Sequence, residues 1–375
     1  MLFRSIFDKF LFNIFNSINN SFNRIIFFNY ILIFDARFVI FITSSLMKYQ
    51  SREIRKEFIM GSKITIIGAG SVGSTIAHIL SLKPYVSELV MIDILKDKAD
   101  GEIMDMAQGT GFRDPISMIA GDYEDAAGSD IVIVTSGVAR KPGQTRIELA
   151  KTNVAIMKNI APQVAKHAPN ALCIIVANPV DVLTYAFLKY SGMKENQVIG
   201  SGTLLDTVRL TYKLSQELGI AQRSIKGYVF GEHGDTSFIP WSMVTVEGIK
   251  LDEYTKGARR LGIDANDFDP DEVITYVRKS GGEIIKRKGA TFYGVANSVV
   301  DVCEALMGAQ DLVTVVSSMM HGEYGVDDVC TSCLTVIGPN GVKGKIEATL
   351  TDEEVAKFKA SAEALKAVIK EMDIE

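Results

Sequence analysis

A glycine-rich turn between an apolar run and a helical run constrains the fold of this 375-residue chain more than any other feature. Residues 63–67 form a short β-rich apolar run, Gly68-Ala-Gly-Ser-Val-Gly73 follows, and residues 74–82 have helical character. Glycines at this spacing permit a tight turn and close packing of a helix on the preceding strand. The segment therefore predicts the first strand–turn–helix unit of a parallel sheet.

Further apolar runs repeat this arrangement along the next hundred residues. They lie at residues 89–92, 131–135 and 173–177, and helical stretches such as residues 146–166 lie between them. Continuous apolar runs of this length are typical of strands that are covered on both faces. Strands that alternate with helices predict an α/β fold, with a Rossmann-type, doubly wound parallel sheet.

The pattern becomes mixed from about residue 205. The runs there predict two helices and three strands, at residues 206–218, 271–288, 228–230, 242–246 and 334–337. Thr351 and Glu354 form a capping box, which predicts the start of a last helix. We therefore predict two domains, a Rossmann domain over residues 61–204 and a mixed α+β substrate domain over residues 205–375.

The glycine-rich turn also predicts a cofactor. Gly70 lets the backbone approach a pyrophosphate, which the amino end of the following helix attracts. Asp93 lies twenty residues after Gly73, at the end of the next apolar run. A carboxylate there accepts hydrogen bonds from the adenosine ribose and repels a 2′-phosphate, so we expect NAD rather than NADP.

Residues 1–60 differ in composition from the rest of the chain. They hold 12 of the 19 phenylalanines and no glycine. The longest apolar runs, residues 25–34 and 38–47, are about half of what a bilayer span requires. An interfacial anchor and a targeting segment remain alternatives. We expect a start assigned too far upstream, because Met60 directly precedes Gly61-Ser-Lys-Ile-Thr-Ile-Ile-Gly68, an abrupt start for a nucleotide-binding strand.

Charge and cysteine content exclude other classes of protein. Forty basic and 45 acidic residues give a net charge of −5, which argues against nucleic acid as the main partner. Four cysteines in this length exclude a disulfide scaffold and indicate a reducing cytoplasm. Cys330 and Cys333 are three residues apart in a strand-like run, without a second pair, so we predict no metal site.

Several polar residues stand where a parallel sheet places ligands. Arg146 ends a loop after one strand-like run, and Asn178 follows another. Asp206 and Arg209 share one helical face. His233, one of four histidines, lies in Gly231-Glu-His-Gly-Asp-Thr236, where flanking glycines and acids disfavour a packing role.

Together these segments resemble the L-lactate/L-malate dehydrogenase family. The motifs GAGSVG, RKPGQTR, ANPVD, GSGTLLDTVR and GEHGDT agree with the family in order and spacing, and the resemblance covers about residues 63–372. It implies that His233 is the acid/base, that Asp206 orients it, and that Arg209 binds the substrate carboxylate. It further implies that Arg146 polarises the substrate carbonyl.

The resemblance implies additional contacts. Asn178, in an expected cis peptide bond with Pro179, and Thr291 would contact the substrate. Positions that match cofactor contacts, besides Asn178, are Gly68, Gly70, Val72, Gly73, Asp93, Lys98, Tyr123, Gly137, Val138, Asn159, Val176 and Ser201. Family members form dimers or tetramers, so we expect a homo-oligomer.

Different residues of the resemblance point to different substrates. Arg140 occupies the position that faces the substrate side chain, where malate enzymes have arginine and lactate enzymes have glutamine. Ser201, Thr291 and the GEHGDT segment resemble lactate dehydrogenases instead. We expect L-lactate dehydrogenase, acting in fermentation or glycolysis, with malate dehydrogenase as the alternative. A non-catalytic NAD-binding homologue is disfavoured because His233, Asp206, Arg146 and Arg209 are all present.

Overall fold

A computed structural model describes residues 61–112, 115–139, 145–263 and 268–374. The predictions made for residues 1–60 and for Arg140 lie outside these residues. The elements up to residue 200 are β1 (Ser62–Ile67), α3 (Ser71–Ser81), β2 (Val86–Ile92), α4 (Lys96–Gln108), β3 (Ser117–Ala120), β4 (Ile131–Val134), α5 (Arg146–His167), β5 (Leu172–Ile175), α6 (Val180–Ser191) and β6 (Val198–Gly200).

The six strands of this part form one parallel array, in the spatial order β3-β2-β1-β4-β5-β6. The chain runs outward in one direction from β1 and then in the other direction from β4. This order confirms the predicted doubly wound sheet. Ligands bind such sheets outside the carboxyl ends of the strands, where the order reverses.

The second part of the chain extends the same sheet. Its elements are α7 (Leu204–Leu218), β7 (Ile225–Lys226), β8 (Thr245–Val246), β9 (Ile249–Lys250), α8 (Leu251–Arg260), α9 (Pro270–Lys288), α10 (Tyr293–Met307), β10 (Leu312–His321), β11 (Asp327–Gly338), β12 (Gly341–Lys345) and α11 (Asp352–Glu371). Strand β10 pairs antiparallel with β6, and β11 and β12 follow. The boundary between residues 204 and 205 stays a prediction, since the sheet continues across it.

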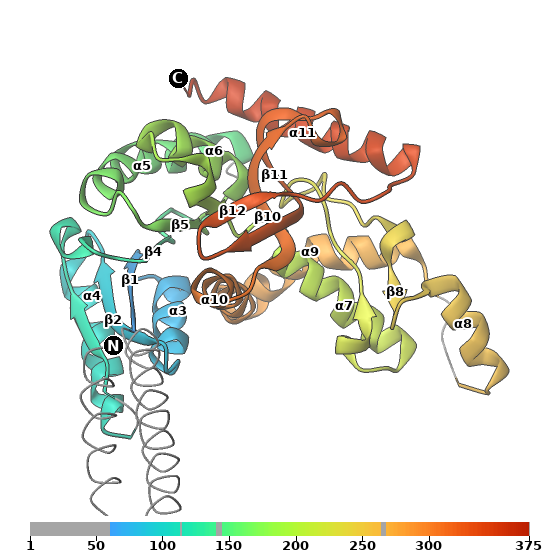
Figure 1. Ribbon diagram of the computed structural model, residues 1–375, viewed down its shortest axis with the longest axis horizontal. Helices are drawn as coiled ribbons and strands as arrows, with labels where there is room; N and C mark the ends of the chain where they lie inside the picture. Colours follow the sequence, from blue (N-terminus) through green and yellow to red (C-terminus); the bar gives the residue numbers. More distant parts are fainter. Residues whose placement is uncertain (1–60, 113–114, 140–144, 264–267, 375) are drawn as a thin grey trace, which may run out of the picture. The chain divides into compact units, whose positions relative to one another are not determined.

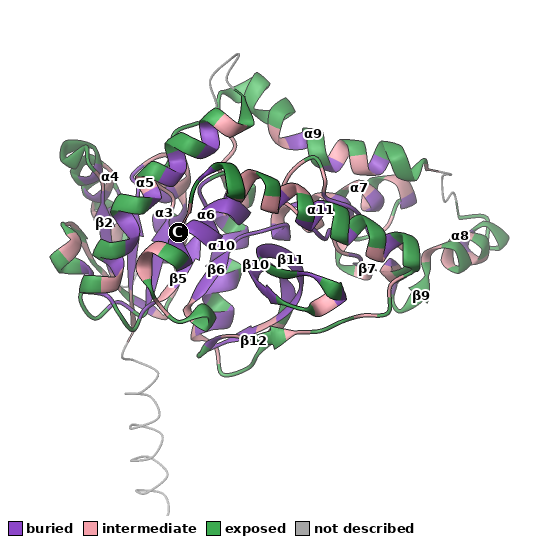
Figure 2. Ribbon diagram, turned by 90° about the horizontal axis from the view of Figure 1, so that it is seen from above, coloured by how far each residue is buried: buried purple, intermediate pink, exposed green. Residues whose placement is uncertain are grey.

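Helices cover both faces of the parallel sheet. Helices α5 and α6 pack together on one face, and α3 and α10 pack together on the other (Figure 1). The strands between them are almost entirely buried (Figure 2). A second apolar cluster joins α7 and α9 to the small sheet of β7, β8 and β9. This cluster supports the helix that carries Asp206 and Arg209.

Two strand predictions in the second part were wrong. Residues 228–230 form no strand, and only an isolated bridge joins Phe230 to Phe238. Residues 242–246 begin as a 3-10 turn, Trp241–Met243, and only Thr245–Val246 is a strand. Both segments are apolar because they pack on the two cores, and β-rich composition alone does not distinguish such packing from strand pairing.

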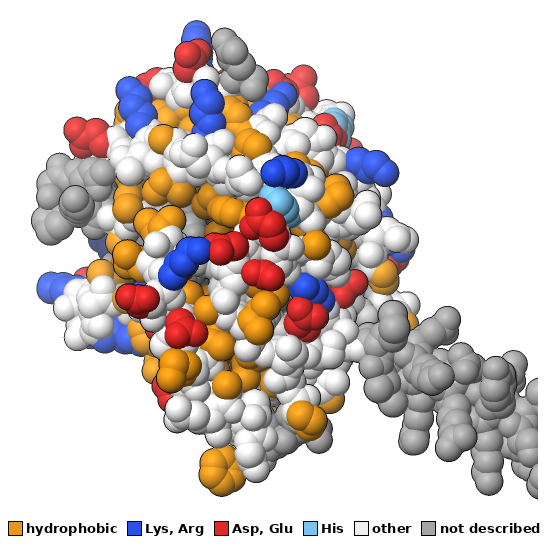
Figure 3. All heavy atoms as spheres, turned by 90° about the vertical axis from the view of Figure 1, so that its left-hand side faces the viewer, with side chains coloured by type: hydrophobic (Ala, Val, Ile, Leu, Met, Phe, Trp, Pro, Cys, Tyr) orange, Lys and Arg blue, Asp and Glu red, His pale blue; other side chains and the backbone are white. Residues whose placement is uncertain are grey.

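The surface carries charges of both signs. Acidic and basic side chains lie among apolar ones over the face seen in Figure 3. In the part of the chain that the structure describes, no helix is both long enough and apolar enough to cross a bilayer.

Candidate functional site

The glycine-rich turn between β1 and α3 leaves an open cradle. Gly68 adopts a φ of +116°, which favours glycine. A Cβ on Gly73 would lie 1.9 Å from the carbonyl oxygen of Gly68, whereas a Cβ on Gly70 would meet nothing within 4 Å. Gly73 is therefore needed for packing, and the space beside Gly70, at the amino end of α3, can accept a phosphate group.

Two side chains from other strands fix this turn. Asp93, just after β2, accepts hydrogen bonds from the backbone N–H of Ala69 at 2.6 Å and of Leu95 at 2.9 Å. Thr135, just after β4, donates to the carbonyl of Gly68 at 3.0 Å. These hydrogen bonds fix the shape of the turn. The cradle and the acid beside it fit an adenine dinucleotide.

The second feature is a cluster of three charged groups. Asp206 and Arg209 lie on α7, and His233 lies in the loop that follows Phe230. His233 Nδ1 is 2.5 Å from Asp206 Oδ2, and Arg209 Nη1 is 2.8 Å from Asp206 Oδ1. The sequence placed these residues in one site, and the structure brings them together around one buried carboxylate.

The electrostatics of this cluster favour a charged imidazole. Asp206 raises the pKa of His233 above its ordinary value, against the effect of burial. Burial alone would raise the pKa of Asp206, but His233 and Arg209 together lower it. Because Asp206 binds Nδ1, the other ring nitrogen of His233 can exchange a proton with a ligand.

Arg146 contacts the same loop from α5. It is the first residue of α5, whose start is fixed by a capping box between Thr145 and Glu148. Its Nη2 lies 2.7 Å from Asp235 Oδ2, and its Nη1 lies 3.7 Å from Glu232 Oε1. These two acids flank His233, so the Arg146 guanidinium lies beside the histidine loop. About half of its side chain is exposed, which leaves it able to bind an anion.

Asn178 follows β5, and its peptide bond with Pro179 is cis, as predicted. The carbonyl of Asn178 accepts a hydrogen bond from Asn153 Nδ2 at 2.6 Å. Asn153, buried on α5, also accepts from the backbone N–H of Val138 at 2.8 Å. It therefore ties two strand-end loops together. Sequence reasoning missed Asn153, since a polar residue inside an otherwise ordinary helix gives no signal of long-range contacts.

The other predicted positions lie in several settings. Gly137, Val176 and Ser201 follow the ends of β4, β5 and β6, where the reversal of strand order places a ligand. Thr291 is half-buried between α9 and α10. The remaining ones are Val72 and Tyr123, which are half-buried, and Val138, Lys98 and Asn159, which are exposed.

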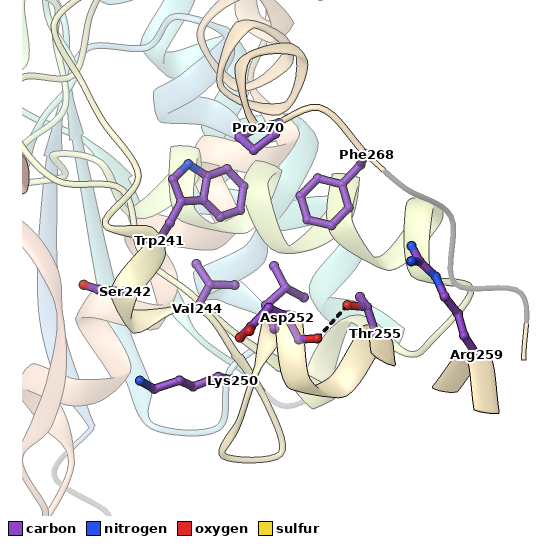
Figure 4. Close-up of a pocket in the computed structure, with 10 residues that line it drawn as sticks. Trp241, Ser242, Val244, Lys250, Asp252, Thr255, Arg259, Phe268 and Pro270 are labelled. Atoms are coloured by element: carbon purple, nitrogen blue, oxygen red, sulfur yellow. Dashed lines mark hydrogen bonds between the residues drawn. The ribbon is translucent and has the colours of Figure 1, made fainter. Parts of the chain in front are cut away.

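A separate hollow lies between α8 and the start of α9 (Figure 4). Its volume is about 430 Å³, and it contains none of the predicted site residues. The rings of Trp241 and Phe268 form its apolar wall, with centroids 5.9 Å apart. Lys250 and Asp252 lie at its other side.

The chain matches two family models that together cover its described part. Residues 62–200 match the NAD-binding domain of lactate/malate dehydrogenase, and residues 203–374 match the alpha/beta C-terminal domain of the same family. Curated relatives include L-lactate dehydrogenases from Acetivibrio thermocellus and Thermoanaerobacter pseudethanolicus. The first is 42% identical, and the match covers 83% of this chain and 98% of the relative. The second is 43% identical, and the match covers 84% of this chain and 100% of the relative.

Solved structures give the same result. An L-lactate dehydrogenase from Enterococcus mundtii in ligand-bound form has a TM-score of 0.79 at 36% identity, and covers 84% of this chain and 99% of its own. A malate dehydrogenase from Archaeoglobus fulgidus in complex with NADH has a TM-score of 0.73 at 34% identity, and the match covers 83% of this chain and 99% of the malate dehydrogenase. Family models, curated relatives and solved structures thus agree, and the chain belongs to the lactate/malate dehydrogenase family.

Proposed function

We propose that the chain is an NAD-dependent L-lactate dehydrogenase that interconverts pyruvate and L-lactate. The observation that carries the proposal is the cluster of His233, Asp206 and Arg209. A proton donor and a carboxylate-binding cation stand side by side in it, as reduction of a 2-oxo acid requires. The relatives named L-lactate dehydrogenase support this choice.

Each residue of the cluster has a distinct task. Protonated His233 donates to the carbonyl oxygen of the substrate and accepts the proton back in the reverse direction. Asp206 holds the tautomer and stabilises the imidazolium, while Arg209 binds the substrate carboxylate through two parallel hydrogen bonds. Arg146 polarises the carbonyl as charge develops on its oxygen.

The remaining residues place the reactants. The Asn178 amide binds the substrate oxygen, and Thr291 lines the pocket. Gly70 and Asp93 hold the pyrophosphate and the adenosine ribose of the cofactor. When bound, NADH supplies the hydride that the carbonyl carbon receives.

Malate dehydrogenase is the second candidate, because of Arg140. A charge at a closed site loses about 2–5 kcal/mol when its partner is missing. Pyruvate would then react roughly 30- to 4000-fold less efficiently than oxaloacetate. The curated relatives and the Enterococcus mundtii structure, all named L-lactate dehydrogenase, support the first candidate over this one.

We also propose a cytoplasmic homo-oligomer, either a tetramer or a dimer. All four cysteines are buried and unbridged, which suits a reducing compartment. Helix α7 exposes Val208 and Tyr212, and α10 exposes Tyr293. Apolar side chains on neighbouring helices suit an interface with a second copy. A sedimentation mass near that of one chain would contradict this part.

The test of the substrate is the initial rate of NADH oxidation by the full chain, measured separately with pyruvate and oxaloacetate. A higher kcat/KM with pyruvate supports lactate dehydrogenase. A preference of about a hundredfold for oxaloacetate, reversed by Arg140→Gln, would establish malate dehydrogenase instead.

A further inference from the structure

A buried carboxylate that the proposed chemistry does not use lies behind the histidine loop. Asp181 is in the first turn of α6, three residues after Asn178, and is 2% exposed. Helix α6 packs here against β10 and β11. An ionisable group removed from water needs compensating contacts, so its surroundings indicate what it does.

Asp181 contacts the histidine loop directly. Its Oδ2 accepts a hydrogen bond from the backbone N–H of His233 at 2.7 Å. Its Oδ1 and the hydroxyl of Ser317 on β10 are both buried, and the Ser317 hydroxyl acts to lower the pKa of Asp181. An anchor for one N–H needs a single acceptor, which an amide oxygen would supply equally well. The backbone contact does not need the negative charge, which therefore calls for another role.

The charged groups around Asp181 indicate a role in the ionisation of His233. Asp181 faces His233, Glu232 in the same loop, and Cys330 on β11, while Asp206 and Arg209 face His233 from α7. Burial raises the pKa of Asp181 to about 6. The pKa of His233 is raised mainly by Asp206 and further by Asp181, and Arg209 opposes them.

We infer that Asp181 is a positioning residue for His233, which fixes the backbone of the histidine loop and adds a second buried negative charge that stabilises the imidazolium. The inference rests on the proposed function, since it concerns the proton that His233 donates. Asp181 acts on the substrate only through His233. Since Asn178, three residues earlier, is the proposed substrate contact, one short segment would both bind the substrate and position its proton donor.

The test compares Asp181→Asn with the unchanged full chain. Asparagine keeps the volume and one acceptor oxygen but removes the charge. The readout is the pH dependence of His233 modification by diethyl pyrocarbonate, with His233→Gln identifying the contribution of this histidine. About a quarter of the His233 side chain is exposed, so the reagent can reach it. We expect the pKa of His233 to fall by about half a unit or more, because a nearby opposite charge favours the protonated form.

A matched control is Ser361→Ala. Ser361 on α11 accepts a hydrogen bond from the backbone N–H of Glu232 at 2.8 Å, and thus anchors the same loop without a charge. This variant should leave the pKa of His233 unchanged. The kinetic counterpart is the alkaline limb of kcat/KM for pyruvate, which should move to lower pH in Asp181→Asn only.

An unchanged pKa of His233 in folded Asp181→Asn would overturn the inference. If that variant does not fold, hydrogen exchange of the unchanged chain decides: the His233 amide should exchange slowly, and exchange as fast as that of an exposed loop overturns the inference. The modification assay needs no turnover. If the unchanged chain reduces no 2-oxo acid, the proposed function fails while the effect of Asp181 on His233 is still measured.

Discussion

Replacing Asp206 with asparagine tests the origin of the acid strength of His233. The Asp206 carboxylate lies 2.5 Å from His233 Nδ1 and is 5% exposed. Two unit charges about 4 Å apart interact by roughly 4 kcal/mol at an effective dielectric constant of 20. Arg209 shares the same carboxylate and cancels part of this attraction. We expect a net loss of about 2–3 kcal/mol in the stabilisation of the imidazolium, so the pKa of His233 should fall.

The assay is the pH dependence of kcat/KM for pyruvate. Reduction needs protonated His233, so activity declines as pH rises through the pKa of His233. In Asp206→Asn this decline should move to lower pH. At pH values above the decline, kcat/KM should be about 30- to 150-fold lower than in the unchanged chain. The loss would reach about 10⁴-fold if the asparagine amide forces the wrong tautomer. An unchanged limb, with activity reduced equally at every pH, would refute the electrostatic reasoning.

Stability gives an independent readout of the same pair. The folded pKa of His233 lies above its ordinary 6.5, so its contribution is fully present below about pH 6.5 and is lost as pH rises through the folded value. The folded pKa of Asp206 lies below its ordinary 3.8, so its contribution is lost as pH falls. The difference in Tm between the unchanged chain and Asp206→Asn should therefore be largest between about pH 4 and 6.5.

Four further predictions follow from the same contacts. Gly70→Ala should raise the KM for NADH with little change in Tm, whereas Gly73→Ala should lower Tm strongly, since only the second clashes with protein atoms; equal Tm values would contradict this. Asp93→Ser should increase the rate with NADPH relative to NADH, because the repelling charge is lost; unchanged selectivity would argue against a ribose contact. Thr145→Ala should destabilise by about 1 kcal/mol in denaturant unfolding, through loss of the cap of α5. As pH rises from 4 to 7, the free energy of unfolding of Asp181→Asn should increase by about 3 kcal/mol relative to that of the unchanged chain. The reason is that Asp181 has a pKa of about 6 in the folded chain and near 3.8 in the unfolded chain, so its ionisation destabilises the unchanged protein; parallel stability curves would contradict this.

Local signals predicted the parts of the fold that depend on neighbouring residues. The glycine-rich turn is a local steric requirement, and the structure has strand, turn and helix where the motif placed them. The capping box of Thr351 and Glu354 begins α11, as predicted. Such features can be predicted from the sequence because each depends on contacts within a few residues.

Features that depend on distant pairing were not predicted in full. Strand β11 extends well beyond the predicted run at residues 334–337, and β10, with which it pairs along most of its length, was not predicted. Asn153 and Asp181 were not recognised, since their partners lie 15 to 52 residues away along the chain. Residue patterns singled out His233, Asp206 and Arg209, but the family resemblance was needed to join them in one site, because the sequence keeps their segments apart.

The most direct test of the proposed chemistry is the product balance of NADH oxidation with pyruvate, using the full chain and His233→Gln side by side. We expect one L-lactate to form for each NADH oxidised. We also expect a loss of about 10²- to 10⁴-fold in kcat for His233→Gln, with NADH binding retained. Comparable activity of the two proteins, or no turnover of either pyruvate or oxaloacetate by the unchanged chain, would contradict it.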